Sequence, residues 1–361
     1  MLPTFPLKNH IFNIHLLVYF KMKFEAVTIK DIAKELGIST STVSRALRDS
    51  YEISPETKQM VLECAERMKY RPNPIAQSLK ERRSRSIGIV VCEIANTFFS
   101  QVINGIESIA YDKGYNVIIS QSHESTEREL IDIQYLASRS VDGLIVSVAA
   151  ETRDFSLFNE LAERGMPIVF FDRIVDEIKT HKVIADNHKG AYDATVHLIQ
   201  KGYKQIAFIG NDEGLSITKE RLEGYTTALK ENNVEINNAF IKYCRHGGMI
   251  AAEINTVMDD LLSLNHKPDV IFAAADKLTT GCLRYLNAKN IKIPETIALI
   301  GFSNSDLTEL LNPPLTVIRQ PAFEMGKQAT RLLLEIIEAR RPVTDFQTTV
   351  LSTDLIIRGS A

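Results

Sequence analysis

The sequence predicts a small helical domain at the N-terminus, followed by a large α/β core with parallel sheets. Between Val27 and Pro72, apolar residues recur at helical spacing among cap and turn signals, which predicts three short helices. From Ser86 onward, short β-rich runs alternate with amphipathic helices, a pattern typical of parallel sheets covered on both faces. The chain has 361 residues, a length that favours about two domains.

The first two helices are expected around a tight turn within residues 27–47. Thr28 is placed to cap the first helix, with Asp31 as its capping-box partner, and Gly37 is placed to end it in the left-handed conformation. Ser39 is placed to cap the second helix. The outward positions of that second helix carry small hydroxyl side chains and one long cation: Thr40, Ser41, Thr42, Ser44 and Arg45.

Such a face suits the DNA major groove, where hydroxyls donate or accept and an arginine can hold a guanine through two acceptors. The same pattern is also typical of an ordinary helical hairpin with a polar, solvent-exposed face. The next residues favour the DNA interpretation. Ser54 and Pro55 begin a third helix that closes a three-helix core, and Tyr70–Pro72 ends it.

Residues 73–80 then predict a short hinge helix, with a leucine next to the basic run Lys80–Arg85. A marginal helix of this kind suits folding on DNA, with Leu79 inserted into a minor-groove step. The alternative is a linker with an incidental leucine, but a preceding helix-turn-helix favours DNA. The candidate DNA contacts outside the second helix are Thr28, Asn73, Ala76, Leu79 and Lys80.

Three stretches, VTIKDIAKELGISTSTVSRAL, SPETKQMVLECAERMKYRPNPIAQSLK and SIGIVV, resemble the N-terminal region of the lactose-repressor (LacI/GalR) family. The resemblance runs from about Val27 to the C-terminus. It implies a DNA-binding headpiece over 27–72, a hinge helix and linker over 73–85, and a ligand-binding and dimerisation core over 86–361. That core would have two lobes like those of periplasmic binding proteins. The implied molecule is a homodimer that binds a palindromic operator in double-stranded DNA and responds to a small effector.

Residues 1–26 match nothing in this scheme and are expected to be an upstream extension or a disordered tail, with Met22 as a candidate true start. The apolar run Ile11–Phe20 contains Asn13 and His15 and lacks a small-residue cleavage site, unlike a signal peptide. No apolar run reaches the length that spans a membrane. We therefore expect a cytoplasmic protein.

Charge is unevenly distributed along the chain. Residues 27–86 hold 12 lysines and arginines against 8 acids, whereas the chain from Ile87 onward holds 27 against 36. A basic headpiece on an acidic core concentrates attraction to phosphate at one end. The cysteines are scattered without paired spacing or a zinc pattern, so reduced thiols and no metal site are expected. These cysteines are Cys64, Cys92, Cys244 and Cys282.

The sequence from Ser86 onward predicts alternating strands and helices that suit two similar lobes. The expected strands are 86–91, 115–120, 143–148, 167–171, 182–185, 205–210, 270–274, 297–301, 316–319 and 351–357, with helices over 99–113, 190–201, 220–232 and 323–339. In the family the chain crosses between the lobes three times. We place these crossings near Asp186, near Pro313–Leu315 (about residue 314), and within 320–339, before Ala339.

A nicotinamide-dependent enzyme is the competing class for repeated βα units. Its dinucleotide fingerprint needs glycines in the turn after the first strand. Here the sequence GIVVCEIANTFF has one glycine inside the strand and none in the turn. No phosphate loop, nucleophile elbow or Ser/His/Asp spacing stands out, so neither catalysis nor a cofactor is expected.

The resemblance implies an effector site between the lobes, formed by Asn96, Phe98, Phe99, Asp172, Arg173, Arg221, His246, Asp276, Ser303 and Gln320. One phenylalanine of the pair is expected to anchor its helix and Phe99 to stack on a sugar ring. The Asp172–Arg173 pair can take adjacent hydroxyls in charge-assisted hydrogen bonds. Arg221 matches a pocket arginine of the family, although solvated helix arginines are commoner.

Two departures from the family weaken the match to free monosaccharides: Ser303 stands where many members have aspartate, and Ala275 where many have asparagine. If Arg173, Arg221 and His246 converge, a sugar acid or sugar phosphate becomes a rival to a sugar. Purine binding is less favoured, partly because the chain has no tryptophan. The sequence thus predicts a DNA-binding transcriptional repressor controlled by a sugar or sugar derivative. The alternative is a sugar-binding protein without a regulatory role.

Overall fold

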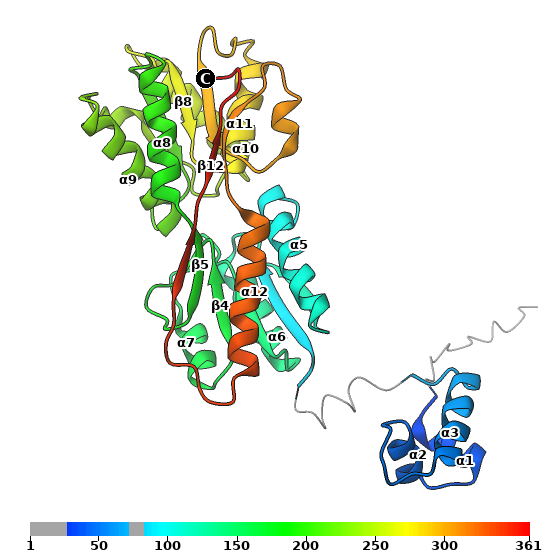
Figure 1. The fold of residues 1–361 in the computed structure, drawn as a ribbon. Helices are drawn as coiled ribbons and strands as arrows, with labels where there is room; N and C mark the ends of the chain where they lie inside the picture. Colours follow the sequence, from blue (N-terminus) through cyan, green and yellow to red (C-terminus); the bar gives the residue numbers. More distant parts are fainter. Residues whose placement is uncertain (1–26, 72–82) are drawn as a thin grey trace, which may run out of the picture. The chain divides into compact units, whose positions relative to one another are not determined.

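The computed structural model describes residues 27–71 and 83–361, which belong to two separate compact units (Figure 1). The smaller unit is the helical headpiece and the larger is the α/β core. The expected tail over 1–26 and most of the expected hinge lie outside the described residues. The same holds for four predicted DNA contacts: Asn73, Ala76, Leu79 and Lys80.

The headpiece consists of three short helices: α1 (Ile29–Leu36), α2 (Thr40–Ala46) and α3 (Pro55–Arg67). Each contributes apolar side chains to one small core, whose buried members are Ile32, Ala33, Val43, Ala46, Val61, Cys64 and Ala65. In water such short helices are marginal alone, so this shared core stabilises them.

Local side-chain contacts fix where the first two helices begin and end. The Asp31 carboxylate accepts hydrogen bonds from the backbone N–H of Thr28 at 2.8 Å and from its hydroxyl at 2.7 Å. Gly37 ends α1 with a φ of 66°, in the left-handed region that glycine enters without a Cβ penalty. The Ser39 hydroxyl then accepts from the backbone N–H of Thr42 at 3.0 Å and caps α2.

Lobe 1 of the core contains a six-stranded parallel sheet in the order β11-β5-β4-β3-β1-β2. Its strands are β1 (Ser86–Val91), β2 (Asn116–Gln121), β3 (Gly143–Val146), β4 (Ile168–Phe171), β5 (His181–Ala185) and β11 (Thr348–Leu351). One face is covered by α5 (Thr97–Asp112) and α12 (Ala322–Glu338), and the other by α6 (Thr126–Ser138) and α7 (Ser156–Glu163). The central strands β3 and β4 are apolar throughout, as expected for a sheet buried on both faces.

Lobe 2 repeats this plan in the order β12-β10-β9-β8-β6-β7, with only β12 antiparallel to its neighbour. Its strands are β6 (Ile206–Gly210), β7 (Ile241–Tyr243), β8 (Val270–Ala273), β9 (Ala298–Phe302), β10 (Thr316–Arg319) and β12 (Asp354–Ile356). The helices α8 (Asn187–Gln200) and α9 (Ser216–Glu231) cover one face, and α10 (Ala251–Ser263) and α11 (Asp276–Ala288) the other. Two short 3₁₀ helices, η1 (Asn238–Phe240) and η2 (Asp306–Glu309), complete this lobe.

The chain crosses between the lobes three times: one crossing lies near Asp186 as expected, one lies at the start of the expected 320–339 segment, and one lies outside every expected position. The first lies at Asp186, between β5 and α8. The second follows β10 at Gln320–Pro321, not Pro313–Leu315, because the prolines lie in the loop that leads into β10 within lobe 2. The third lies at Ser352–Thr353, beyond Ala339, because the expected last strand is divided into β11 in lobe 1 and β12 in lobe 2.

Helix α12 lies beside α5 along lobe 1 (Figure 1). Glycine permits this close approach on both helices. A Cβ on Gly105 would lie 2.0 Å from the carbonyl oxygen of Phe323, and one on Gly326 would lie 2.1 Å from that of Val102. Within residues 27–71 and 83–361, no helix is both long and apolar enough to cross a membrane.

Candidate effector cleft and DNA-contacting helix

The predicted DNA-contacting face lies on α2 of the headpiece. Val43 and Ala46 are buried in the headpiece core, whereas Thr40, Ser41 and Arg45 are exposed. The guanidinium of Arg45 lies 3.2 Å from the Glu52 carboxylate, and both side chains are about half exposed. A surface ion pair of this kind is weak, so Arg45 can exchange Glu52 for another acceptor.

The other hydroxyls of this region differ in availability. The Thr28 hydroxyl donates to Asp31, and the hydroxyls of Thr42 and Ser39 share a hydrogen bond of 2.8 Å. Ser44 is half-buried beside them. Thr40, Ser41 and Arg45 are therefore the most accessible polar groups on α2.

In the core, polar side chains from both lobes meet at the carboxyl ends of the strands, where open α/β sheets usually bind ligands. They surround a cavity of about 50 Å³ between the lobes. Its walls are formed by Cys92, Glu93, Asn96, Phe99, Glu124 and Arg173 of lobe 1, and by Asn211, Gly247, Met249, Ala275, Asp276 and Lys277 of lobe 2. Four residues expected in the effector site are among them: Asn96, Phe99, Arg173 and Asp276.

The two lobes contact each other around this cavity. The Lys277 ammonium pairs with Glu93, and the Asn304 amide donates to the Gln101 side chain at 2.8 Å. At another part of the interface, the Arg153 guanidinium lies 2.6 Å from the Asp212 carboxylate. Apolar side chains of both lobes also pack together there: Ala150, Leu215 and Ile217. Small-molecule sites typically measure roughly 300–1,000 Å³, so these contacts must rearrange before a sugar-sized molecule can enter.

Arg173 is already paired within lobe 1. Its two terminal nitrogens donate to the two carboxylate oxygens of Glu124, at 2.5 and 2.9 Å. Both side chains are buried. Burial alone would raise the pKa of Glu124, but the charge of Arg173 and its hydrogen bonds outweigh that effect, and the pKa is lowered. Glu124 also accepts from the backbone N–H of Ala150 at 2.8 Å, so the pair is tied to the loop that contacts lobe 2.

Arg221 is held in lobe 2 by neutral partners. Its Nε donates to the Asn187 side chain at 2.8 Å, and Nη1 donates to the carbonyl of Ala274 at 2.7 Å. The guanidinium lies over the Phe302 ring, 3.8 Å from its centroid, a favourable cation–π geometry. Burial lowers the pKa of Arg221 to about 10, against the opposing charges of Asp172 and Glu220. Arg221 therefore remains a cation at neutral pH.

Asp172 lies next to this arginine rather than on the cavity wall. Its carboxylate accepts from the Gln320 amide at 3.3 Å, and its φ of 57° is left-handed, a conformation that is uncommon outside glycine. Burial raises the pKa of Asp172, although the charges of Arg221 and Arg173 oppose that shift. Asp172 and Gln320 thus connect the end of β4 to the second crossing.

Asp276 and Ser303 form a short hydrogen bond in lobe 2, with the Ser303 hydroxyl donating at 2.5 Å. Burial raises the pKa of Asp276, and this hydrogen bond opposes the rise. Ser303 therefore fixes the orientation of a neighbouring carboxylate.

Six expected residues do not line the cavity: Asp172, Arg221, Ser303 and Gln320, whose contacts are given above, and also Phe98 and His246. Phe98 packs in the lobe 1 core with its ring centroid 5.2 Å from that of Phe99, while Phe99 lines the cavity. His246 is exposed, with its Nδ1 lying 3.6 Å from the Glu253 carboxylate. The expected convergence of His246 with the two arginines is therefore wrong, because the turn at Gly247–Gly248 leaves the imidazole outside the cavity wall.

Sequence reasoning missed five polar residues of this site: Glu93, Glu124, Asn187, Asn211 and Lys277. No local pattern marked them, because each is important through a contact or position set by the tertiary fold. Glu124, for example, is 49 residues from Arg173 in the chain. Among the described residues, no group of three His, Cys, Asp or Glu side chains is placed to hold a metal ion.

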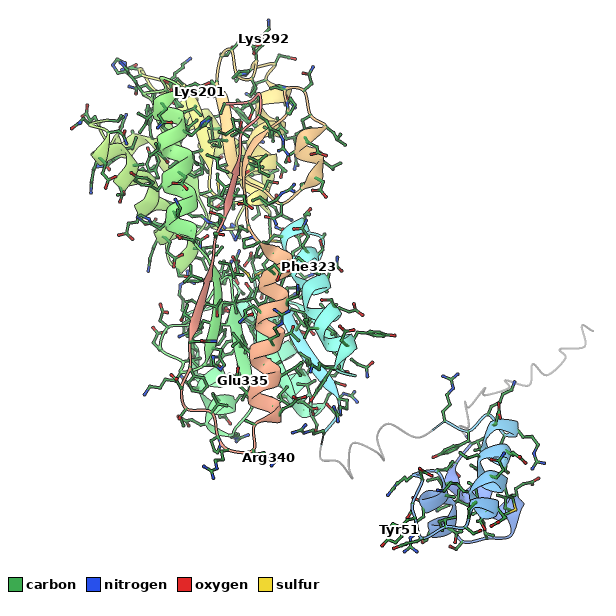
Figure 2. The ribbon with its side chains drawn as sticks, viewed as in Figure 1. Tyr51, Lys201, Lys292, Phe323, Glu335 and Arg340 are labelled. Atoms are coloured by element: carbon green, nitrogen blue, oxygen red, sulfur yellow. The ribbon has the colours of Figure 1, made fainter. Side chains whose placement is uncertain are left out.

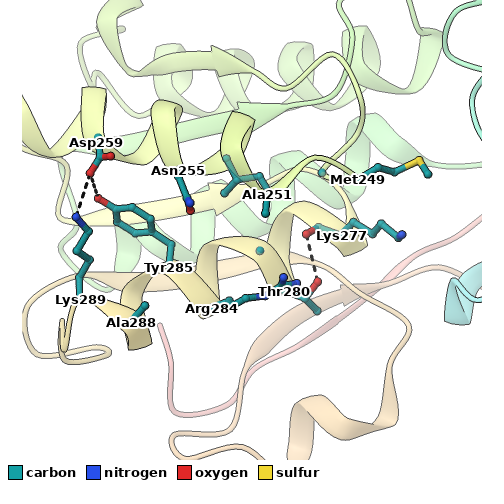
Figure 3. A pocket seen from close by; sticks show the side chains of 13 residues that line it. Met249, Ala251, Asn255, Asp259, Lys277, Thr280, Arg284, Tyr285, Ala288 and Lys289 are labelled. Atoms are coloured by element: carbon teal, nitrogen blue, oxygen red, sulfur yellow. Dashed lines mark hydrogen bonds and ion pairs between the residues drawn. The ribbon is translucent and has the colours of Figure 1, made fainter.

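A larger hollow of about 400 Å³ lies between α10 and α11 of lobe 2 (Figure 3). Asp259 on its wall contacts both the Tyr285 hydroxyl and the Lys289 ammonium. The hollow shares Met249 and Lys277 with the cavity between the lobes. The smaller cavity is the candidate effector site, because residues of both lobes line it, whereas all the residues that line the larger hollow belong to lobe 2.

Comparisons with known proteins agree with this architecture. Residues 28–73 match the family described as bacterial regulatory proteins, lacI family, and residues 195–361 match the periplasmic binding protein-like domain. The HTH-type transcriptional repressor CytR of Escherichia coli (strain K12) is 32% identical over 340 residues, covering 94% of this chain and 98% of that protein. The HTH-type transcriptional repressor PurR of Vibrio vulnificus is 31% identical over 335 residues, covering 92% and 98%.

Solved structures show the same fold. The complex of the transcriptional regulator CelR with cellobiose is 29% identical, with a TM-score of 0.68, and the match covers 93% of this chain and 100% of that one. The lac repressor dimer bound to operator and an anti-inducer is 22% identical, with a TM-score of 0.76 and coverage of 93% and 99%. The chain therefore belongs to the LacI family, and it is a DNA-binding transcriptional regulator rather than an enzyme.

Proposed function

We propose that this chain is a cytoplasmic, homodimeric repressor that binds its operator through α2 and changes its operator affinity when a small hydroxylated effector binds between the lobes. The proposal rests on one observation: polar side chains from both lobes line the same cavity. A ligand that touches both lobes changes the free energy of their relative arrangement, and this is the requirement for coupling to a second site. The effector would either release the operator or promote its binding.

The proposed DNA contacts begin with Arg45. Its exposed guanidinium can bind the two major-groove acceptors of a guanine once it leaves Glu52. Thr40 and Ser41 are exposed beside it and can contact phosphates or base edges. We further propose Leu79 as a minor-groove wedge, with Asn73, Ala76 and Lys80 around it, on the sequence argument alone.

Exposed apolar side chains on the core support a homodimer. Phe323 projects from α12 of lobe 1 (Figure 2), and Tyr111 on α5 of the same lobe is 76% exposed. On lobe 2, Leu307 and Leu310 are 67% and 76% exposed. Exposed apolar groups of this size are typical of protein interfaces, and a symmetric dimer would present two copies of α2 to an inverted-repeat operator.

Selection of binding sites from random double-stranded DNA tests this function. We expect the selected sites to be inverted repeats, since two identical headpieces would bind. The Arg45→Ala variant should bind its best site about 1–3 kcal/mol more weakly and accept other bases at one position per half-site.

Arg67→Ala is the matched control, because Arg67 is an exposed headpiece arginine on α3 that pairs with Glu35. It should leave the selected sequence unchanged. Failure to enrich any sequence would contradict the proposed operator binding through α2. Equal losses by Arg45→Ala on specific and random DNA would limit Arg45 to phosphate contacts.

A further inference from the structure

The cavity between the lobes contains an unfilled hydrogen-bond acceptor. Asn211 follows β6, lines the cavity and is 4% exposed. Its Oδ1 has no hydrogen-bond partner within the described part of the chain. A buried polar atom without a partner is costly, so a bound molecule that donates a hydrogen bond to Asn211 would remove that cost.

The charges on the cavity wall also favour a ligand that donates hydrogen bonds. The wall carries three carboxylates, Glu93, Glu124 and Asp276, but only two cations, Arg173 and Lys277. Each cation already has a carboxylate partner, since Arg173 pairs with Glu124 and Lys277 pairs with Glu93. Asp276 is the remaining carboxylate, and it accepts hydrogen bonds from the Ser303 hydroxyl and the Asn304 backbone.

The charges next to this wall do not reverse the balance. Arg221 contributes one positive charge and Asp172 one negative charge, and the two oppose each other. An anion entering the cavity would therefore lose its hydration and face a wall with more negative than positive charge. A hydroxyl or amino group would instead find acceptors at Asn211 and Asp276.

We propose that the effector carries no anionic group in this cavity and presents O–H or N–H donors to Asn211 and Asp276. Among the described residues, the acceptor Asn211 Oδ1 and the donor Arg173 Nε both lack a hydrogen-bond partner. A hydroxyl suits either of them, because it can donate its hydrogen and accept through its oxygen. Neutral polyols and their amino derivatives are thus selected over sugar acids and sugar phosphates. This inference rests on the proposed function of the cleft and specifies its ligand class.

The first test compares neutral, amino and anionic forms of the same skeleton by isothermal titration calorimetry. Suitable sets are glucose with glucosamine, glucuronate and glucose 6-phosphate, ribose with ribose 5-phosphate, and nucleosides with their monophosphates. In any set that binds, we expect the anionic member to bind about tenfold or more weakly than the neutral or amino member. An anionic member that binds as well or better would overturn the proposal.

The second test needs no knowledge of the effector and uses inorganic phosphate as the probe. The wild-type protein should show no saturable phosphate binding that depends on Arg173. The Glu124→Gln and Asp276→Asn variants each remove one negative charge from the wall, and at least one should gain saturable phosphate binding. Glu253→Gln is the matched control, because Glu253 pairs with His246 outside the cavity, and it should behave as wild type.

Wild-type phosphate binding that Arg173→Ala removes would contradict the proposal, and so would the absence of any gain in both charge variants. The second variant keeps the test valid if Glu124→Gln fails to fold. These outcomes are separate from the proposed regulatory function, because site selection on random DNA depends on α2 in the headpiece, which the cavity variants leave unchanged.

Discussion

The two lobes each bury an arginine at the cleft, but they hold it by different means. In lobe 1, Arg173 is neutralised by two hydrogen bonds to the Glu124 carboxylate. In lobe 2, Arg221 donates to an amide oxygen and a backbone carbonyl and lies over an aromatic ring. Removing Arg173 would break two hydrogen bonds to a buried carboxylate, whereas Arg221 donates only to neutral groups and acts on the nearby Asp172 through its charge alone. The difference predicts unequal costs of substitution.

The largest effect is expected from Arg173→Met. Glu124 would then be buried without its cation, and breaking a buried pair in this way costs about 3–5 kcal/mol of unfolding free energy. The double variant Arg173→Met/Glu124→Gln should recover much of the loss, because no charge is stranded. Urea unfolding followed by circular dichroism measures both. A double variant as unstable as the sum of the two single variants would show that the pair does not act as a unit.

Lobe 1 holds another buried carboxylate, Glu129, which sharpens the comparison because its hydrogen-bond partners are neutral. Burial raises the pKa of Glu129 to about 7, against hydrogen bonds from Thr152 and the Ala149 backbone. The folded protein thus retains this proton where the unfolded chain has lost it, so this group's contribution to stability should fall as pH rises from about 4.5 to about 7.

Glu129→Gln should remove that pH dependence and add up to about 3 kcal/mol at pH 8. The amide oxygen can still accept from the Ala149 backbone, and the amide nitrogen can donate to the Thr152 hydroxyl, which reverses the direction of that hydrogen bond. Glu127→Gln, an exposed position on the same helix, is the control and should leave the pH profile unchanged. Unfolding free energies measured from pH 5 to pH 8 for the wild type and both variants test this expectation. An unchanged slope in Glu129→Gln would assign the effect to another group.

Arg221→Met should cost less than Arg173→Met, about 1–3 kcal/mol, since its direct hydrogen-bond partners are uncharged. Arg221→Lys keeps the charge but loses the planar fork that contacts Asn187 and Ala274 together. It should therefore recover only part of the loss. The same urea experiment compares the variants, and a cost for Arg221→Met equal to that for Arg173→Met would remove the proposed contrast between the lobes.

The smallest effect is expected in the headpiece, where the Arg45–Glu52 pair is exposed. Glu52→Gln should change headpiece stability by less than about 1 kcal/mol. It should also strengthen operator binding, because Arg45 would no longer have to break its ion pair with the Glu52 carboxylate before it contacts DNA. Gel-shift titrations at constant ionic strength measure this gain. A weaker operator complex would mean that Glu52 positions Arg45 productively.

The headpiece could be predicted from the sequence in detail because its signals are local. Asp31, Gly37 and Ser39 each act within three or four residues of their contacts, so spacing alone predicts the helix ends. The alternating elements of the core also predicted two α/β lobes. The paired state of Arg173 could not be predicted, since Glu124 reaches it only after β2 and β4 take their places in the sheet.

Other differences have a similar origin. His246 was assigned to the site by resemblance, but the orientation of its side chain depends on the Gly247–Gly248 turn and on Glu253. The second crossing was placed at Pro313–Leu315 from the resemblance to the family. In the fold those prolines precede β10, and the strand continues in lobe 2 before the chain crosses.

The three crossings also determine the order in which the lobes can be completed on the ribosome. Lobe 1 begins with β1 but takes its last helix, α12, and its last strand, β11, from beyond residue 321. The apolar face that α12 covers, which includes Val102 and Ile106, therefore stays uncovered while nearly all of lobe 2 is synthesised. Nascent chains with such exposed faces are prone to aggregate. Synthesis of lobe 1 begins before that of lobe 2, but its fold is completed only near the end of the chain. The apolar face is covered once α12 packs on it.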